Sequence, residues 1–320
     1  MKLLDPAVIG TIIGMSSRRI ALVFPGQGSQ YVGMGKALHD ASEAAREVFK
    51  RADEILGFRL SHLCFSGPEE DLQDTINAQP AIFTVSLATL AAIKEKLHEA
   101  GVKLNPSFVA GHSLGEYTAL VAANVIDFED GLRLVRERGR LMKEEGEKIP
   151  GGMAAVIGLD EEVIQRACEE ASSEGIVGIA NSNSPGQIVI SGELKALHRA
   201  MELLQQQGAK KVIKLPISIA SHSPVMQRAA AQFAEIVSHM KLRDPQIPIV
   251  ANVTGQILTN VEDIRRELSH HITGPVQWTK SIREMLSHGT NGFIELGPKR
   301  VLTGLIQRIS PGVDTISTDS

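Results

Sequence analysis

Residues 108–115 read Phe-Val-Ala-Gly-His-Ser-Leu-Gly, a short apolar run that leads directly into a G-x-S-x-G pentapeptide. The helix-prone residues 116–121 follow at once, so the chain is predicted to turn from a buried strand into a helix within two or three residues. Such a turn strains its central residue, and flanking glycines let neighbouring backbone approach without a Cβ clash. The Ser113 hydroxyl is then exposed at the positive end of a helix, where backbone N–H groups stabilise an oxyanion. The pattern predicts acyl chemistry through Ser113.

Composition narrows the function classes. At 320 residues the chain is long enough for one large domain, or for a domain that carries a smaller insert. The net charge is −4, and no Lys/Arg cluster is interleaved with aromatic residues, which argues against a nucleic-acid partner. Cys64 and Cys168 lie far apart with no Cys/His cluster, which argues against a disulfide framework or a zinc site. We expect buried thiols in a reducing cytosol, and thus a cytoplasmic protein.

The N-terminal residues 1–14 are predicted to be an appendage to the fold. Their apolar patch, residues 7–13, is too short to span a bilayer. Asp5 precedes this patch and the pair Arg18-Arg19 follows it, which is the wrong order for a signal peptide. No other stretch is expected to form a transmembrane helix, so no membrane partner is predicted.

Buried strands and amphipathic helices alternate over most of the chain. This alternation predicts an α/β fold whose parallel sheet is covered on both faces, in a hydrolase-like large domain of residues 15–146 and 216–320. The predicted strands are 20–24, 108–110, 247–252 and 292–296, and the predicted helices are 35–56, 78–97, 128–145 and 225–240.

The pattern changes at residues 143–152, which read as a solvated connector. Beyond it the predicted order is βαββαβ, the ferredoxin-like unit. Its strands are 153–157, 175–180, 187–191 and 211–215, and its helices are 161–171 and 193–207. We therefore predict that residues 147–215 form a ferredoxin-like small domain inserted in the large one, with Pro216 marking the return.

A serine nucleophile needs a general base, and the chain has ten histidines as candidates. His112 is a poor base because side chains of consecutive residues at a strand end diverge. His222 lies in Ile-Ala-Ser-His-Ser-Pro, a loop that enters a helix where the chain returns from the insert. From the residues alone, a loop histidine such as His222 is more often a solvated surface residue than a base.

Seven short segments occur in a distinctive order along the chain. They are Phe-Pro-Gly-Gln-Gly-Ser-Gln at 24–30, Gly-His-Ser-Leu-Gly-Glu at 111–116, Arg-Gly at 138–139, Asn-Ser-Asn-Ser-Pro-Gly-Gln at 181–187, Ser-His at 221–222, Pro-Val-Gln-Trp at 275–278 and Glu-Leu-Gly-Pro at 295–298. Together they resemble the malonyl-CoA:acyl carrier protein transacylase family and the acyltransferase domains of polyketide and fatty acid synthases. The resemblance covers nearly the whole chain.

The resemblance implies a role for each matching residue. Ser113 would attack the thioester of malonyl-CoA, and His222 would take its proton and return it to the leaving thiol. The backbone N–H groups of Gln27 and Leu114 would hold the oxyanion. Arg138 would bind the malonate carboxylate with two parallel hydrogen bonds. The acyl group would then pass to the phosphopantetheine thiol of holo acyl carrier protein, with no metal or redox cofactor.

The resemblance also assigns three residues, Asn181, His112 and Ser221, to substrate binding, with Asn181 covering the serine. Ser221 is compatible with a malonyl or a substituted malonyl group. Two of the roles have simpler alternatives. Gln27 could only shape a turn, and Arg138 could be one of several arginines on a solvated helix face, together with Arg133, Arg136 and Arg140.

The chain departs from the resemblance at His271. Bacterial members of the family usually carry glutamine four residues before the Pro-Val-x-Trp motif, and its carbonyl orients the catalytic histidine. Here an imidazole occupies that position, so we expect either His271 or a backbone carbonyl to orient His222.

Rival functions stay open at this stage. A hydrolase or editing thioesterase would share Ser113 and His222 but would not need Arg138. A non-catalytic docking module would have lost Ser113 or His222, and both are present. An acyltransferase for a substituted malonyl unit is a further alternative, and the sequence does not separate fatty acid from polyketide synthesis. We expect the protein to be a monomer.

Overall fold

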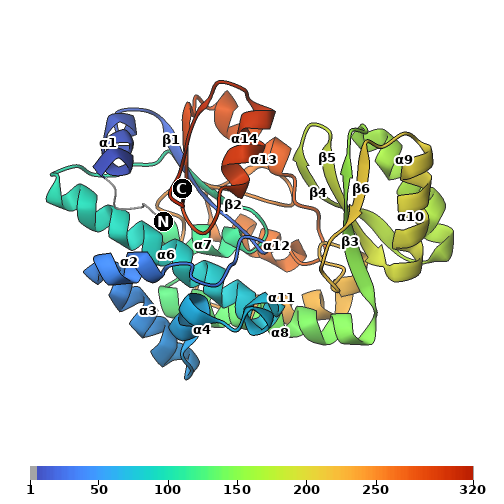
Figure 1. Cartoon of the computed structure of the whole chain (residues 1–320), viewed down its shortest axis with the longest axis horizontal. Coiled ribbons are helices and arrows are strands. Elements are labelled where there is room, and N and C mark those ends of the chain that lie inside the picture. The colour runs from blue at the N-terminus through green and yellow to red at the C-terminus, as the bar shows by residue number, and fades with distance from the viewer. Residues whose placement is uncertain (1–5, 320) are drawn as a thin grey trace.

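The computed structural model describes residues 6–319 and contains two separate β-sheets, at the left and right of Figure 1. The larger sheet has six strands in the order β10-β9-β1-β2-β7-β8. Its strands run parallel, as predicted, except that β8 pairs antiparallel with β7 at one edge. They are β1 (Ile20–Phe24), β2 (Phe108–Gly111), β7 (Ile249–Val250), β8 (Ile257–Leu258), β9 (Gly292–Glu295) and β10 (Asp314–Ser317).

Helices surround this sheet. Those on the N-terminal half of the chain are α1 (Pro6–Met15), α2 (Lys36–Ala41), α3 (Glu43–Leu56), α4 (Leu60–Ser66), α5 (Glu69–Gln73), α6 (Thr75–Glu99), α7 (Gly115–Ala122) and α8 (Phe128–Lys148). Those that follow the smaller sheet are α11 (Gln227–His239), α12 (Val261–His270), α13 (Trp278–Ser287) and α14 (Val301–Ile309).

Alternate residues of β1 enter two different cores, so both faces of the sheet are covered. Leu22 and Phe24 pack in the core that α6, α7 and α8 share. Ala21 and Val23 pack in a second core with apolar residues of α13 and α14. This arrangement explains why the strand is apolar along its whole length, and it places the carboxyl ends of β1 and β2 side by side, with Phe24 opposite Gly111.

The smaller sheet is antiparallel, with strand order β4-β5-β3-β6. Its elements follow the predicted βαββαβ order, and two helices pack on one face around a core of their own. All of them lie within residues 147–215. They are β3 (Gly151–Ile157), α9 (Glu161–Ala171), β4 (Val177–Ser184), β5 (Gln187–Glu193), α10 (Leu194–Gln206) and β6 (Lys211–Lys214).

The prediction of a solvated connector at residues 143–152 is wrong. Helix α8 continues to Lys148, and β3 begins at Gly151. Ion pairs between side chains three or four residues apart support the last turns of the helix, as between Arg140 and both Glu137 and Glu144. The charged residues 143–148 therefore belong to the last turns of the helix.

The prediction that no stretch could form a transmembrane helix also needs correction. By length and composition, α6 is apolar enough to cross a membrane, but 83% of its apolar window is buried inside the fold. It packs among the helices α3, α7 and α8, as the core helix of a globular protein does. Burial inside the fold is enough to explain why the helix is apolar.

Helix α6 begins at Thr75, three residues earlier than predicted, so Pro80 lies beyond the first turn. Proline has no N–H and cannot bond the carbonyl four residues before it, which belongs to Ile76. Arg136 of α8 supplies the missing donor, because its Nη1 lies 2.8 Å from the Ile76 oxygen. The proline is thus accommodated by the neighbouring helix.

Residues 1–14 were expected to stand apart from the fold. The described part of that segment lies in α1, whose Ile12 and Met15 are buried against the large core. Met15 also packs on the backbone of Gly292 in β9, where an added Cβ would lie 2.3 Å from the Met15 Cε. From Pro6 onward the segment packs with the large domain; residues 1–5 lie outside the described residues.

Candidate active site

The turn between β2 and α7 has the strained geometry that the pentapeptide predicts. Ser113 has a φ of 51°, in the left-handed region that residues with a side chain seldom adopt. The glycines on both sides are required by crowding. A Cβ on Gly111 would lie 1.8 Å from the backbone of Gly115, and a Cβ on Gly115 would lie 2.0 Å from the carbonyl oxygen of Phe24. Ser113 is thereby presented at the carboxyl end of the sheet.

Ser113 and His222 form a hydrogen-bonded pair. The Ser113 Oγ lies 2.8 Å from the His222 Nε2, and the His222 Nδ1 lies 2.9 Å from the carbonyl oxygen of Gly274. Because a carbonyl can only accept, Nδ1 carries the proton and Nε2 accepts the hydrogen bond from the serine hydroxyl. This arrangement is the one that general-base activation of a serine requires.

Burial keeps His222 neutral. Its pKa lies well below the ordinary value of 6.5, chiefly because the ring is desolvated, and the nearby imidazole of His271 and the guanidinium of Arg138 lower it further. The base is therefore in its proton-accepting form at neutral pH.

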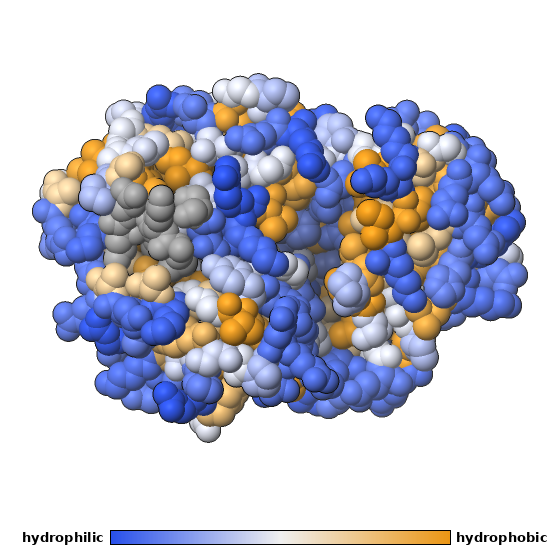
Figure 2. Space-filling view, viewed as in Figure 1, coloured by the Kyte–Doolittle hydropathy of each residue, from blue (hydrophilic) through white to orange (hydrophobic). Residues whose placement is uncertain are grey.

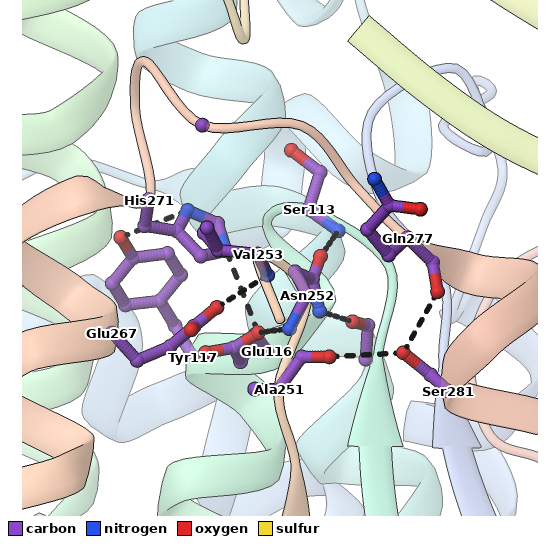
Figure 3. Close-up of polar contacts among 12 residues, drawn as sticks. Ser113, Glu116, Tyr117, Ala251, Asn252, Val253, Glu267, His271, Gln277 and Ser281 are labelled. Atoms are coloured by element: carbon purple, nitrogen blue, oxygen red, sulfur yellow. Dashed lines mark hydrogen bonds and ion pairs between the residues drawn. The ribbon is translucent and has the colours of Figure 1, made fainter. Parts of the chain in front are cut away.

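His271 does not orient His222, so that sequence-based expectation is wrong and the backbone alternative is correct. The two rings meet edge to face at 5.7 Å between centroids, but the His271 Nδ1 lies 3.4 Å from the Tyr117 hydroxyl and its Nε2 lies 3.6 Å from a Glu116 carboxyl oxygen. The imidazole is fully buried and turned toward α7, as Figure 3 shows. The carbonyl of Gly274 occupies the position of the orienting acceptor.

Arg138 is not on a solvated helix face, because it is only 1% exposed. Its Nη1 donates to the side-chain oxygen of Gln79 at 2.7 Å, and its Nη2 lies 3.3 Å from the Ser113 Oγ. The guanidinium also lies over the Tyr117 ring, 5.4 Å from its centroid. Within residues 6–319 its buried Nε has no acceptor. Because Nε and Nη2 form one edge of the fork, the side chain keeps a carboxylate-binding edge beside the nucleophile.

The first loop lies against the turn that carries Ser113. An added Cβ on Gly26 would lie 2.3 Å from the carbonyl oxygen of His112, so the loop approaches as closely as glycine allows. The Gln27 side chain accepts a hydrogen bond from the Thr75 hydroxyl at 2.9 Å. In the described part of the chain, neither the Gln27 nor the Leu114 backbone N–H has an acceptor. Both amides are therefore available to an oxyanion.

A cavity of about 230 Å³ opens beside these groups, lined by residues of the smaller sheet and by loops and helices of the large domain. The His112 Nε2 bonds the Asn183 side-chain oxygen at 2.7 Å, and β4 is tied to the large domain by Val276, whose N–H donates to Ala180. Figure 2 shows that the surface is hollowed between two lobes, one built on the six-stranded sheet and the other on the four-stranded sheet. A larger groove adjoins the cavity there. Predicted site residues that line the cavity are Gln27, His112, Ser113, Arg138, Asn181, Ser221 and His222.

Residues 21–317 match the acyl transferase domain family, whose members the sequence motifs resemble. The chain belongs to this family.

Curated relatives in the acyl transferase family match over nearly their full length. A malonyl CoA-acyl carrier protein transacylase of Bacillus subtilis is 42% identical, with 93% of each chain covered. The protein of the same name from Escherichia coli K12 is also 42% identical, over 94% of this chain and 95% of the relative.

Solved structures agree with this assignment. An acyl carrier protein S-malonyltransferase of Vibrio cholerae superposes with a TM-score of 0.88 at 39% identity, over 94% of this chain and 97% of that one. PlMCAT, a malonyl-transacylase in complex with its type II PKS acyl-carrier protein AntF, superposes with a TM-score of 0.89 at 42% identity. The match covers 94% of this chain and 96% of that one.

The site of this acyl transferase also contains residues that the sequence analysis did not single out. Gln79 holds Arg138, Gly274 orients His222, and Asn183 holds His112. Asn183 was within a motif that was recognised, but only Asn181 was given a role. Gln79 and Gly274 carry no pattern of their own, because their roles depend on chain segments that meet only in the fold.

Within the described residues there is no group of three or more His, Cys, Asp or Glu side chains that could hold a metal ion. Cys64 and Cys168 are both buried and unpaired. Burial raises the pKa of the Cys168 thiol to about 12, so this group is not a reactive thiolate.

Proposed function

We propose that this acyl transferase moves the malonyl group from malonyl-CoA to the phosphopantetheine thiol of holo acyl carrier protein, through a malonyl ester on Ser113. The observation that carries the proposal is the position of Arg138. Its guanidinium lies 3.3 Å from the nucleophilic oxygen of a correctly oriented Ser–His pair. The names of the curated relatives and the solved complex with an acyl-carrier protein support the same donor and acceptor.

The first half-reaction loads the enzyme. The Ser113 Oγ attacks the thioester carbon as its proton passes to the His222 Nε2, and the carbonyl electrons become an oxyanion held by the N–H groups of Gln27 and Leu114. The C–S bond then breaks. The leaving thiolate takes the proton from His222, which leaves a malonyl ester and a neutral imidazole.

The second half-reaction repeats these steps with a new nucleophile. The phosphopantetheine thiol gives its proton to His222 and attacks the ester carbonyl. When the tetrahedral intermediate collapses, Ser113 leaves and regains the proton from His222. The Gly274 carbonyl holds the Nδ1 proton throughout, so the same ring nitrogen, Nε2, moves the proton in both half-reactions. These steps balance without a metal or redox cofactor, and we propose that none is used.

Substrate choice follows from charge. The free carboxylate of malonate would bind the edge of Arg138 that Gln79 leaves open, and an acetyl group would leave that buried cation unpaired. A hydrolase would have no use for this arrangement. Ser221 lines the cavity beside His222 and leaves room for a substituted malonyl unit as the alternative substrate.

We further propose a cytoplasmic protein that acts as a monomer and has no nucleic-acid or membrane partner. The two buried free thiols suit a reducing compartment, and the net charge of −4 gives no attraction to polyanions.

The rate of Ser113 acylation is expected to change less than about twofold between pH 6 and pH 7, because burial lowers the pKa of His222 and keeps it unprotonated over this range. An imidazole with an ordinary pKa of about 6.5 would be roughly three-quarters protonated at pH 6 and would lose rate accordingly. Rapid-quench measurement of malonyl-enzyme formation at each pH tests this. A midpoint near 6.5 would contradict the neutral, buried base.

Timed mass spectra of the intact protein test the proposed function. The enzyme is loaded with malonyl-CoA, freed of excess donor and followed alone, with apo carrier protein, or with holo carrier protein. We expect the malonyl ester to persist for minutes alone or with the apo form, because the two lobes enclose the cavity, and to discharge rapidly onto the holo form. Rapid spontaneous loss that is indifferent to holo carrier protein would favour the hydrolase and overturn the proposal.

A further inference from the structure

A buried asparagine clamps the turn that carries the nucleophile. Asn252 lies just beyond β7 and is buried behind Ser113, as Figure 3 shows. Its side-chain oxygen accepts a hydrogen bond from the Ser113 N–H at 2.7 Å, and its side-chain nitrogen donates to the Gly111 carbonyl at 2.6 Å. Because one partner can only donate and the other can only accept, the orientation of the amide is determined. One side chain thus bonds the backbone before and after His112.

The clamp acts where the backbone is strained. A residue with a side chain in the left-handed region costs roughly 1–2 kcal/mol, and such strain persists only where the surroundings enforce it. The bond to the Ser113 N–H restricts rotation of the peptide that enters the turn. Relaxation of this turn would move the Ser113 Oγ away from the His222 Nε2 and re-aim the next amide, that of Leu114.

Asn252 is itself held from two directions. Its backbone N–H donates to a carboxylate oxygen of Glu116 at 2.8 Å, and its carbonyl accepts from the Gln277 N–H at 2.7 Å. Glu116 lies in the first turn of α7, the helix that Ser113 leads into. A closed path of bonds therefore runs from Ser113 to Asn252, through Glu116, and back along α7 to Ser113.

The Glu116 carboxyl suits this position because burial raises its pKa to about 8, which leaves it neutral at pH 7. A neutral carboxyl can accept from the Asn252 amide without adding a buried charge. The His271 Nε2 lies 3.6 Å from it, and neither this nitrogen nor the second Glu116 oxygen has a hydrogen-bond partner within residues 6–319.

We propose that Asn252 is a positioning residue for the acyl transfer, which holds the Ser113 turn so that the nucleophile and the Leu114 amide are aligned. The inference rests on the proposed function and adds a residue that does not touch the substrate. It differs from a purely structural role, in which loss of Asn252 would lower stability and leave the chemical step unchanged.

The test compares Asn252→Ala and Asn252→Asp with Ser281→Ala. Ser281 is a matched control because it is also buried, bonds the neighbouring Ala251 and Gln277 carbonyls, and does not touch the turn. We measure single-turnover formation of malonyl-enzyme, the half-saturating malonyl-CoA concentration and the thermal midpoint. In both Asn252 variants the acylation rate is expected to fall about 10- to 1000-fold, with half-saturation within about threefold of wild type. Ser281→Ala is expected to keep the wild-type rate.

The Asn252→Asp variant adds a readout that a structural role would not move. Ionised, the introduced carboxyl opposes the Gly111 carbonyl; protonated, it can donate to that carbonyl as the amide does. Glu116 and Glu267 face Asn252, and burial raises the pKa of each to about 8, so both stay neutral below pH 7. The rate deficit of Asn252→Asp should therefore shrink as the pH falls from 7 to 5.5, while the wild type stays level. This variant is close to isosteric, so it serves if Asn252→Ala fails to fold.

The outcomes separate the two proposals. If wild-type protein gains no malonyl mass, the proposed function fails. If wild type is loaded but Asn252→Asp acylates at the rate of Ser281→Ala, or its deficit does not change with pH, Asn252 is not a positioning residue.

Discussion

Replacing Ser113 with alanine is expected to abolish malonyl-enzyme formation and to leave the fold intact. The substitution removes the oxygen that accepts the acyl group, and the His222 Nε2 then has no hydroxyl proton to take. Transfer should fall by roughly 10⁴-fold or more, because a pair that acts as a unit loses nearly all of its contribution with either member. Intact-protein mass spectrometry after incubation with malonyl-CoA measures the acyl increment, and thermal unfolding checks the fold.

Ser221→Ala is the matched control, because this hydroxyl lines the same cavity next to His222 in the sequence. That variant should still gain the malonyl increment. If Ser113→Ala retained the label and Ser221→Ala lost it, the nucleophile would have been assigned to the wrong serine.

Arg138→Ala is expected to lower malonyl transfer by roughly 30- to 4000-fold and to shift the relative preference toward acetyl-CoA. The loss of a bidentate charged pair in a desolvated pocket costs about 2–5 kcal/mol, which corresponds to that range. Arg138→Lys should recover only part of the rate, because an ammonium lacks the planar fork that matches a carboxylate. Steady-state kinetics with both acyl donors measures the ratio, which is insensitive to a uniform loss of folded protein.

Arg140→Ala is the control for Arg138, since Arg140 lies two residues further along the same helix and pairs with Glu137 and Glu144 at the surface. Its donor preference should equal that of the wild type. A malonyl-to-acetyl ratio that did not change in Arg138→Ala would remove the arginine from the carboxylate site.

Much of the fold was readable because local patterns and tertiary structure agree. The run before Ser113 is apolar at every position, as a strand covered on both faces must be, and the glycines around it are there because the backbone leaves no space for a Cβ. The βαββαβ order was readable for the same reason, since its helices have one apolar face each. The end of α8 was misplaced because charges that stabilise a helix resemble those of a loop.

The site was less readable, because its geometry depends on segments far apart in the chain. Arg138 and Arg140 look alike in the sequence, and only the packing of α6 against α8 places the first at Ser113. The prediction that the His271 side chain orients His222 failed because it rested on the residue type at one position. The group that accepts the His222 Nδ1 proton is a backbone carbonyl three residues later. The direction of a backbone carbonyl in a loop cannot be predicted from the residue types alone.

The use of the Gly274 carbonyl as the third member of the active site has a consequence for how this enzyme can vary. An orienting group that belongs to the main chain is present whatever the side chain, so no codon change can delete it. An added Cβ at Gly274 would lie 2.8 Å from the His270 carbonyl oxygen, so a substitution there acts by moving the loop. A change of side chain at position 271 therefore leaves the acceptor of the His222 Nδ1 proton in place.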